Sequence, residues 1–200
     1  MFNKIHNVNV WGLKESLMAS GYPMTHGETP VMDYIKADAD HKKRAINLGN
    51  AKAGSGHDCF LKGIVVQFDW RISQVIFPQV ERYHFIDIVS SQSKMHRIQL
   101  AKREDFNENV DFIILNRFME LVEDYNNEDN PYWRKQKFDK VVYSCPMGYE
   151  LTARFTTNYL QLKTIYFQRR HHKLEEWREF CQWIESLPMF KELVLKDEIK

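Results

Sequence analysis

The sequence predicts a single domain of the α/β class over residues 1–200, with helices and strands mixed and helices in the majority. Three observations support that class. Apolar residues recur at intervals of three and four in separate segments, and β-branched and aromatic residues concentrate in the middle third, where strands are expected. With 200 residues, 44% of them hydrophobic, the chain is long and apolar enough for one sizeable core.

The N-terminal quarter predicts two short helices separated by a loop. Apolar residues at helical spacing predict a helix over residues 10–20, before the Gly-Tyr-Pro stop. These residues are Val10, Leu13, Leu17 and Met18. Residues 24–40 show no sustained period and predict a loop with one strand or turn, and a second helix is expected over residues 41–48. The next segment, GNAKAGSGHD at residues 49–58, predicts a loop that lets backbone approach another group closely.

Two strands are expected in the middle third. IVVQF at residues 64–68 predicts the first strand, and YHFIDIV at residues 83–89 predicts the second. Between them, residues 71–80 predict a helix or helical turn interrupted near Pro78. The second strand leads directly into the polar segment SSQSKMHR at residues 90–97.

Helices dominate the C-terminal half of the sequence. An apolar face at helical spacing predicts a helix over residues 110–125, and NNEDNPYWRK ends it. Residues 141–145 predict a short strand. A long helix is expected over residues 151–168, and a last helix over residues 177–187, before a proline. The apolar side of the long helix is formed by Phe155, Tyr159, Leu162 and Tyr166.

The charge balance narrows the classes of function. The chain has 28 Lys and Arg against 27 Asp and Glu, and a net charge of +1 disfavours broad binding to nucleic acid phosphates. No run approaches the roughly 18–20 apolar residues of a membrane span, and the N-terminus has no apolar signal-peptide core, so we expect a cytoplasmic protein. The absence of GxxxxGK[ST], GxGxxG, HExxH and GxSxG motifs disfavours nucleotide hydrolases, Rossmann enzymes, zincins and serine hydrolases.

Neither the cysteines nor the histidines predict a metal site. Cys59, Cys145 and Cys181 are odd in number, far apart and outside any CxxC arrangement, so we expect small buried side chains. His171 and His172 are adjacent, and adjacent residues point to different faces of a helix, which disfavours a zinc site.

Two polar clusters adjoin the expected strands. The first is Ser55-Gly56-His57-Asp58, whose backbone N–H groups and imidazole suit a phosphate or a cofactor; the alternative is a turn whose Asp caps the next element. The second comprises Glu81-Arg82-Tyr83-His84 and residues 90–97. Its Arg suits phosphate or carboxylate, and its hydroxyl and amide groups suit the edge of a base. Its alternative is a Ser-rich turn that caps the next helix.

A third cluster lies at the end of the expected long helix. Asn158 and Lys163 precede Arg169-Arg170-His171-His172-Lys173, and these groups would offer an anion pocket. The alternative is structural, because cations at a helix C-terminus complement the negative end of the helix dipole.

The order of these pieces resembles the flavin-dependent thymidylate synthases, which are marked by an Arg-His-Arg triplet, seven intervening residues and a Ser. In the matching stretch, Arg82 keeps the first member of the triplet, while Tyr83 and His84 replace the other two. The family spacing arrives at Gln92, with Ser93 one position later.

The resemblance extends over roughly residues 40–185. His57 falls where the family has a flavin-contacting His, and CPMGYELTARFTTNYLQL resembles the family's Leu-Pro turn and Asn-bearing helix, with Asn158 at the Asn. Arg169 or Arg170 resembles the substrate-binding Arg, and Trp177 resembles the Trp that follows it. Two other family arginines correspond to Val142 and Leu160.

The resemblance implies an α/β (α+β) fold of the thymidylate synthase-complementing-protein type, with a central, mostly antiparallel sheet flanked by helices. It also implies a homotetramer with active sites built between protomers, FAD in each site and a pyrimidine nucleotide stacked on the flavin. NADPH and methylenetetrahydrofolate are the implied co-substrates, and reduced flavin passes the hydride that completes one-carbon transfer to C5 of deoxyuridylate.

The resemblance also assigns roles to residues. The implied cofactor-binding residues are His57, Arg82, His84 and Asn158. The implied substrate-binding residues are Ser91, Gln92, Ser93, Arg169 and Arg170, of which Ser93, Arg169 and Arg170 are also the implied catalytic residues.

Two hypotheses for the function follow from these observations. The first is an enzyme, a flavin-dependent methyltransferase of the thymidylate synthase type. The second is a catalytically inactive nucleotide- or partner-binding protein on the same fold, supported by the missing arginines. Nucleic-acid binding through RRHHK and KMHR is a weaker interpretation, because the net charge is near zero.

Overall fold

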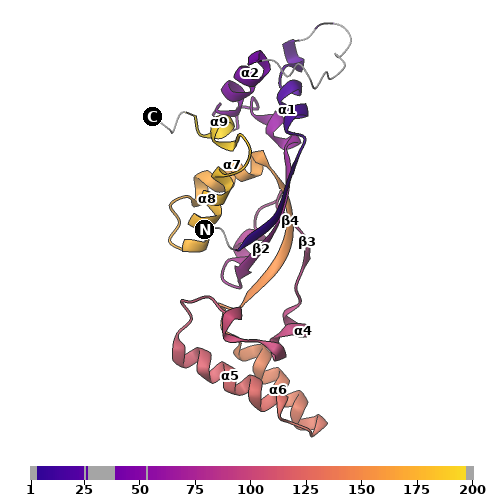
Figure 1. The fold of residues 1–200 in the computed structure, drawn as a ribbon, viewed down its shortest axis with the longest axis vertical. Coiled ribbons are helices and arrows are strands. Elements are labelled where there is room, and N and C mark those ends of the chain that lie inside the picture. The colour runs from indigo at the N-terminus through magenta and orange to yellow at the C-terminus, as the bar shows by residue number, and fades with distance from the viewer. Residues whose placement is uncertain (1–3, 25, 27–38, 53, 197–200) are drawn as a thin grey trace. The chain divides into compact units, whose positions relative to one another are not determined.

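The computed structural model describes residues 4–24, 26, 39–52 and 54–196. Its architecture is mixed α/β with a four-stranded antiparallel sheet in the order β1-β2-β4-β3, which confirms the predicted fold class (Figure 1). The strands are β1 (Ile5–Trp11), β2 (Val65–Ser73), β3 (Asp87–Ser91) and β4 (Glu150–Asn158).

The chain forms two compact units. Unit 1 comprises the described residues of 1–68, 84–87 and 155–200, and unit 2 comprises residues 69–83 and 88–154. The helices of unit 1 are α1 (Leu13–Ala19), η1 (Tyr22–Met24), α2 (Ala39–Gly49), η3 (Cys59–Gly63), α7 (Tyr159–Arg169), α8 (Glu175–Glu185) and α9 (Phe190–Val194). Those of unit 2 are α3 (Phe77–Val80), α4 (Lys94–Arg97), η4 (Ile98–Leu100), η5 (Arg103–Asp105), α5 (Phe112–Asn126) and α6 (Pro131–Ser144). The single domain over residues 1–200 stays a prediction.

Strand β4 corrects the expected long helix over residues 151–168. Only its C-terminal part is helical, as α7, and residues 150–158 form a strand. The strand buries every second side chain, in the order Leu151, Ala153, Phe155 and Thr157. A period of two places these side chains on one face of a sheet, whereas a helix would spread them around its axis.

The core of unit 1 is built around aromatic rings from strands and helix α8. The Phe68 ring lies 5.6 Å from Phe155, 5.7 Å from Phe180 and 4.5 Å from Trp183, measured between ring centroids. All four side chains are buried. The last predicted helix is confirmed as α8, with the one-sided apolar face that the sequence indicated. The short helix α9 after Pro188 was missed.

The core of unit 2 combines the helices α5 and α6 with the start of β4. Helices α5 and α6 pack side by side (Figure 1). The Tyr125 and Phe138 ring centroids lie 5.6 Å apart. Phe106 contacts Phe118 at 5.4 Å and Tyr149 at 5.2 Å, again between ring centroids. Helix α5 confirms the prediction over residues 110–125.

Helix α6 shows that the strand expected over residues 141–145 is wrong. Residues 141–144 are the last turn of this helix. The helix begins at Pro131, and the Asn130 carboxamide oxygen accepts hydrogen bonds from the Tyr132 and Trp133 N–H groups at 3.0 and 3.3 Å. An Asn followed by Pro is a helix-start signal, because Asn caps the free N–H groups and Pro fits the first turn.

Ion pairs align β2 and β4 within unit 2. Asp69 lies 3.1 Å from Arg154, and Arg71 lies 2.9 Å from Glu150. The Gln74 N–H donates to the Tyr149 carbonyl at 3.1 Å. Residue numbers rise along β2 while those of the partners on β4 fall, which is the pattern of an antiparallel pair.

Other predicted boundaries also shift. The first helix, expected over residues 10–20, starts later: residue 10 belongs to β1, and α1 begins after Gly12. The φ of 74° at Gly12 makes the left-handed turn between the two elements. Residues 71–73 continue β2, and Pro78 lies in the first turn of α3 rather than interrupting a helix. The second predicted strand, residues 83–89, forms at residues 87–91 instead.

The strands are spread along the chain more widely than the sequence predicted. Strands are not confined to the middle third, because β1 and β4 lie outside it. The helix over residues 41–48 is confirmed within α2, and most of the loop expected over residues 24–40 lies outside the described residues. Within the described ranges, no helix is long and apolar enough to cross a membrane.

The three cysteines differ in burial. Cys181 is buried, Cys145 is half-buried and Cys59 is exposed, so the expectation of three buried side chains is wrong for Cys59. Burial raises the pKa of the Cys145 thiol to about 11 and that of the Cys181 thiol to about 12. These two thiols therefore stay protonated at neutral pH.

Substituting Gly49→Ala should destabilise the protein by about 1–3 kcal/mol, because the added Cβ would lie 2.2 Å from the Leu193 carbonyl oxygen. Gly54→Ala is the matched control. Its Cβ would meet nothing within 4 Å, but its φ of 81° costs a non-glycine residue about 1 kcal/mol. Urea unfolding of both variants measures the difference, and wild-type stability of Gly49→Ala would contradict this close approach.

Candidate functional site

The candidate residues belong to both units. His57, His84, Asn158, Arg169 and Arg170 lie in unit 1, whereas Arg82, Ser91, Gln92 and Ser93 lie in unit 2. The surroundings of each group are set within its own unit.

The loop before η3 exposes His57 and buries its neighbour Asp58. Gly54 and Gly56 have φ angles of 81° and 80°, a left-handed conformation that suits glycine. The His57 N–H donates to Ser55 Oγ at 3.4 Å, and the imidazole is exposed. Asp58 occupies the N-cap position of η3 but makes no side-chain capping bond, so the alternative of a capping turn is wrong in that respect.

The Asp58 carboxylate instead forms a buried ion pair with Lys163 of α7. Lys163 Nζ lies 2.7 Å from Asp58 Oδ2, and the two side chains are only 6% and 4% exposed. The same nitrogen donates to the Gly49 and Ala51 carbonyls at 2.8 and 3.0 Å. Lys163 is therefore not a solvent-facing cation of an anion pocket. Both residues belong to polar clusters recognised in the sequence, but their pairing was not predicted.

Asn158 is the junction between β4 and α7. Its Oδ1 accepts a hydrogen bond from the Gln161 N–H at 3.0 Å, which caps the helix. Arg169 lies eleven residues later, at the other end of α7, and a rise of 1.5 Å per residue puts the two Cα atoms roughly 16 Å apart. A single copy of α7 therefore does not bring Asn158 and Arg169 together.

Aromatic rings support the arginines at the end of α7. The Arg169 guanidinium lies 4.7 Å from the Trp177 ring centroid, and that of Arg170 lies 5.2 Å from the Phe167 centroid. Both arginines are half-buried. Their charges also complement the C-terminal dipole of α7, so the structural alternative holds alongside any binding role.

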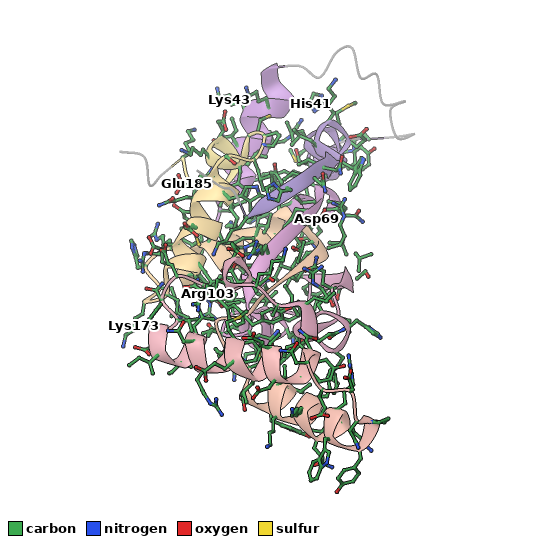
Figure 2. All side chains as sticks on the ribbon, turned by 60° about the horizontal axis from the view of Figure 1, so that its bottom comes forward. His41, Lys43, Asp69, Arg103, Lys173 and Glu185 are labelled. Carbon is green, nitrogen blue, oxygen red and sulfur yellow. The ribbon has the colours of Figure 1, made fainter. Side chains whose placement is uncertain are left out.

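The turn after α7 is fixed by a residue that the sequence analysis missed. Arg178 of α8 donates to the His172 and Lys173 carbonyls at 2.8 and 2.9 Å. Figure 2 labels Lys173 in this turn and Glu185 at the end of α8. No sequence motif marks Arg178, because its role depends on where the turn comes back to α8.

His172 is an acceptor in this turn. Its Nδ1 accepts a hydrogen bond from the Leu174 N–H at 3.1 Å. Burial lowers the pKa of His172 below 6.5, and the nearby cations Arg169, Arg178 and Lys173 lower it further. The imidazole is therefore neutral at pH 7, as an acceptor nitrogen requires.

The polar turn after β3 is attached to β4 within unit 2. The Gln92 N–H donates to the Thr152 carbonyl at 2.9 Å, and Gln92 Oε1 accepts from the Thr152 N–H at 3.1 Å. Ser91 and Ser93 are exposed. Ser93 occupies the N-cap position of α4, as the alternative of a Ser-rich capping turn predicted. Its side chain makes no capping hydrogen bond, so the alternative is wrong on that point.

Arg82 and His84 are exposed on either side of Tyr83. The Tyr83 N–H donates to the Val80 carbonyl at 3.0 Å, which fixes the turn after α3. Within the described part of the chain, neither side chain is held by a hydrogen bond or an ion pair. Both are therefore accessible to a ligand.

The described residues contain a groove away from the candidate residues but no cluster suited to a metal ion. No three His, Cys, Asp or Glu side chains there are close enough to hold a metal ion. A groove of about 420 Å³ lies along α6, beside the connection between α5 and α6, and Glu128, Trp133 and Lys137 are among its lining residues. None of the candidate residues lines it.

The pKa of His172 should rise in the variant Arg169→Gln, because one of the cations that repel its proton is removed. Lys173→Gln is the control and should raise the pKa less, since Arg169 has the larger effect. An NMR titration of the imidazole measures both. His172 adds stability above the unfolded pKa of about 6.5, and that stability is lost as pH falls through its lower folded pKa. Equal pKa values in the three proteins would contradict this arrangement.

Comparison with known proteins identifies the fold. No protein-family model and no curated protein sequence matches the chain. The crystal structure of Thymidylate Synthase X (ThyX) from Helicobacter pylori with FAD and dUMP is 14% identical, with a TM-score of 0.70 over 96% of this chain and 98% of that one. A second ThyX structure from that organism, also complexed with FAD and dUMP, is 14% identical, with a TM-score of 0.64 over 97% and 98%. The chain therefore has the fold of the flavin-dependent thymidylate synthases along nearly its whole length.

Proposed function

We propose that the protein is a flavin-dependent thymidylate synthase-like methyltransferase that binds FAD and a uridylate-type nucleotide in the cytoplasm. The observation that carries this proposal is the likeness of fold, over 96% of the chain, to a structure solved with FAD and dUMP. The candidate residues of each unit support it with suitable donors and acceptors.

Arginine side chains would hold the phosphates. Arg82 is exposed, and Arg169 and Arg170 are half-buried against aromatic rings that limit their rotamers. A planar guanidinium with five N–H donors matches phosphate oxygens in pairs. In this proposal Arg82 serves the cofactor, and Arg169 and Arg170 serve the nucleotide.

The flavin ring would be contacted by His57, His84 and Asn158. Both imidazoles are exposed, and the Asn158 Nδ2 group is left for a ligand because Oδ1 caps α7. These groups bind and orient a ring that offers both donors and acceptors. When bound, FAD supplies the hydride chemistry, with NADPH as reductant and methylenetetrahydrofolate as one-carbon donor.

The polar turn after β3 would contact the base or its phosphate. Gln92 uses its Oε1 and its backbone N–H on Thr152, which holds the turn in place. The exposed Ser91 and Ser93 hydroxyls and the Gln92 Nε2 group remain for substrate. Ser93 is the proposed catalytic member of this turn.

A homotetramer with sites between protomers accounts for the separation along α7. Asn158 and Arg169 are roughly 16 Å apart on one helix, so in this proposal they serve different sites and a second protomer supplies the missing end.

A catalytically inactive binding protein is the second candidate. Val142, which stands at the position of a family arginine, is packed against the hydrophobic core of unit 2. Val142 is partly buried, so a cation at this position would lose part of its hydration, which costs free energy.

Absorption spectra and turnover separate the two candidates. Purified protein incubated with FAD should retain a flavin spectrum after gel filtration, and deoxyuridylate should perturb it. Turnover of deoxyuridylate with methylenetetrahydrofolate and NADPH would exclude the inactive candidate, whereas binding without turnover would favour it. A colourless protein after FAD incubation would contradict both flavin binding and the enzyme proposal.

Substitutions at Asn158 should separate its capping role from its binding role. Asn158→Asp keeps an acceptor oxygen at the N-cap but replaces the Nδ2 donor. Stability should therefore stay near that of the wild type while FAD affinity falls. Asn158→Ala removes the cap and should cost about 1 kcal/mol as well. Urea unfolding and FAD titration measure the two effects. Unchanged FAD affinity in Asn158→Asp would leave Asn158 with a structural role only.

A further inference from the structure

The buried ammonium of Lys163 connects three points of the chain that the sequence separates. Its Nζ contacts the carbonyls of Gly49 and Ala51, at the end of α2, and the carboxylate of Asp58, at the end of the loop. An ammonium group has three N–H donors, and three acceptors surround this one. Lys163 is thus fully engaged inside the protein, with no N–H donor left for a substrate.

The contacts of Lys163 fix both ends of the loop over residues 50–58. Near its start, the Asn50 Nδ2 group donates to the Ile46 and Glu192 carbonyls at 2.8 and 2.9 Å. At its end, Asp58 is 3% exposed and bonded to Lys163. The backbone at the start of the loop and the Asp58 side chain at its end therefore bond to the same atom, Lys163 Nζ.

The middle of the loop depends on these ends. Gly54 and Gly56 both have positive φ angles and no neighbour within 4 Å of a built Cβ. Glycine lowers the cost of many backbone conformations, so these positions by themselves do not hold one conformation. His57 directly precedes the buried Asp58, and its backbone position is therefore set by the Lys163–Asp58 pair.

We propose that Lys163 is a positioning residue that orients His57 for the flavin by holding Asp58 and the loop over residues 50–58. The proposal rests on the proposed function, because it takes His57 as a flavin contact. A purely structural lysine would stabilise the fold without any specific dependence on His57.

A double-mutant cycle on the full chain tests this proposal. We expect His57→Ala and Lys163→Met each to weaken FAD binding about five- to tenfold, the loss of one hydrogen bond. The double variant should be no weaker than Lys163→Met, because His57 is already misplaced in that variant. Lys52→Met, an exposed lysine of the same loop, is the control and should bind FAD like the wild type.

Independent effects would overturn the proposal. In that case the double variant would lose about 25- to 100-fold in affinity, the product of the two single effects. Wild-type FAD affinity in folded Lys163→Met would overturn it too. If circular dichroism shows that Lys163→Met does not fold, Asp58→Asn replaces it in the cycle, since the amide keeps the shape of the side chain but removes the charge that holds Lys163.

Hydrogen exchange without FAD separates this proposal from the proposed function. Faster exchange of the amides of residues 51–57 in Lys163→Met or Asp58→Asn, with the amides of α8 unchanged, supports the positioning role. Equal exchange in the loop overturns it. A wild-type protein that binds no FAD would refute the proposed function, and hydrogen exchange would still decide whether Lys163 holds the loop.

Discussion

The two-residue alternation of β4 is the constraint on which most of the structure depends. One face of this strand contributes Leu151 to the core of unit 2 and Phe155 to that of unit 1, so a single pattern serves both cores. A shift of one residue would turn Thr152 and Arg154 inward and leave their polar groups without water. The strand then passes into α7 without a loop, because Asn158 both ends β4 and caps the helix.

Helix α7 carries charge in two different environments. Lys163 is buried and balanced by Asp58 and two carbonyls, whereas Arg169 and Arg170 lie at the half-buried C-terminal end against aromatic rings. Burial of a charge is tolerated only where its partners replace the hydration shell, and breaking such a pair is strongly destabilising. The interior charge thus bonds to the backbone at the start of the loop and to Asp58 at its end, while the terminal charges lie half-buried at the end of the helix.

The departures from the family pattern have a physical explanation in part. Val142 belongs to the apolar side of α6, so this position now contributes to the core of unit 2 rather than to a cationic site. Tyr83 and His84 follow Arg82 in a turn that a backbone hydrogen bond from Tyr83 to Val80 holds. The chain therefore keeps the fold without the arginines that these positions carry in the family.

Much of the fold and part of the candidate site could be predicted from the sequence. Amphipathic helices α5 and α8 and strand β2 follow from local periodicity, because burial of one face leaves a repeating pattern in the residues. Arg82, Ser93 and His57 were also correctly recognised as exposed polar residues of turns and loops, whereas Ser91 is the last residue of β3, and the roles of all four stay predictions. The sequence misread residues 151–158, where the apolar residues of a strand and of the helix after it coincide with helical spacing. Only the tertiary structure decided that residues 150–158 form a strand. It also revealed the Lys163–Asp58 pair, because an ion pair between residues 105 positions apart leaves no local signal in either segment. The sequence thus determined which segments bury which faces, and the tertiary structure determined which charges had to be buried together.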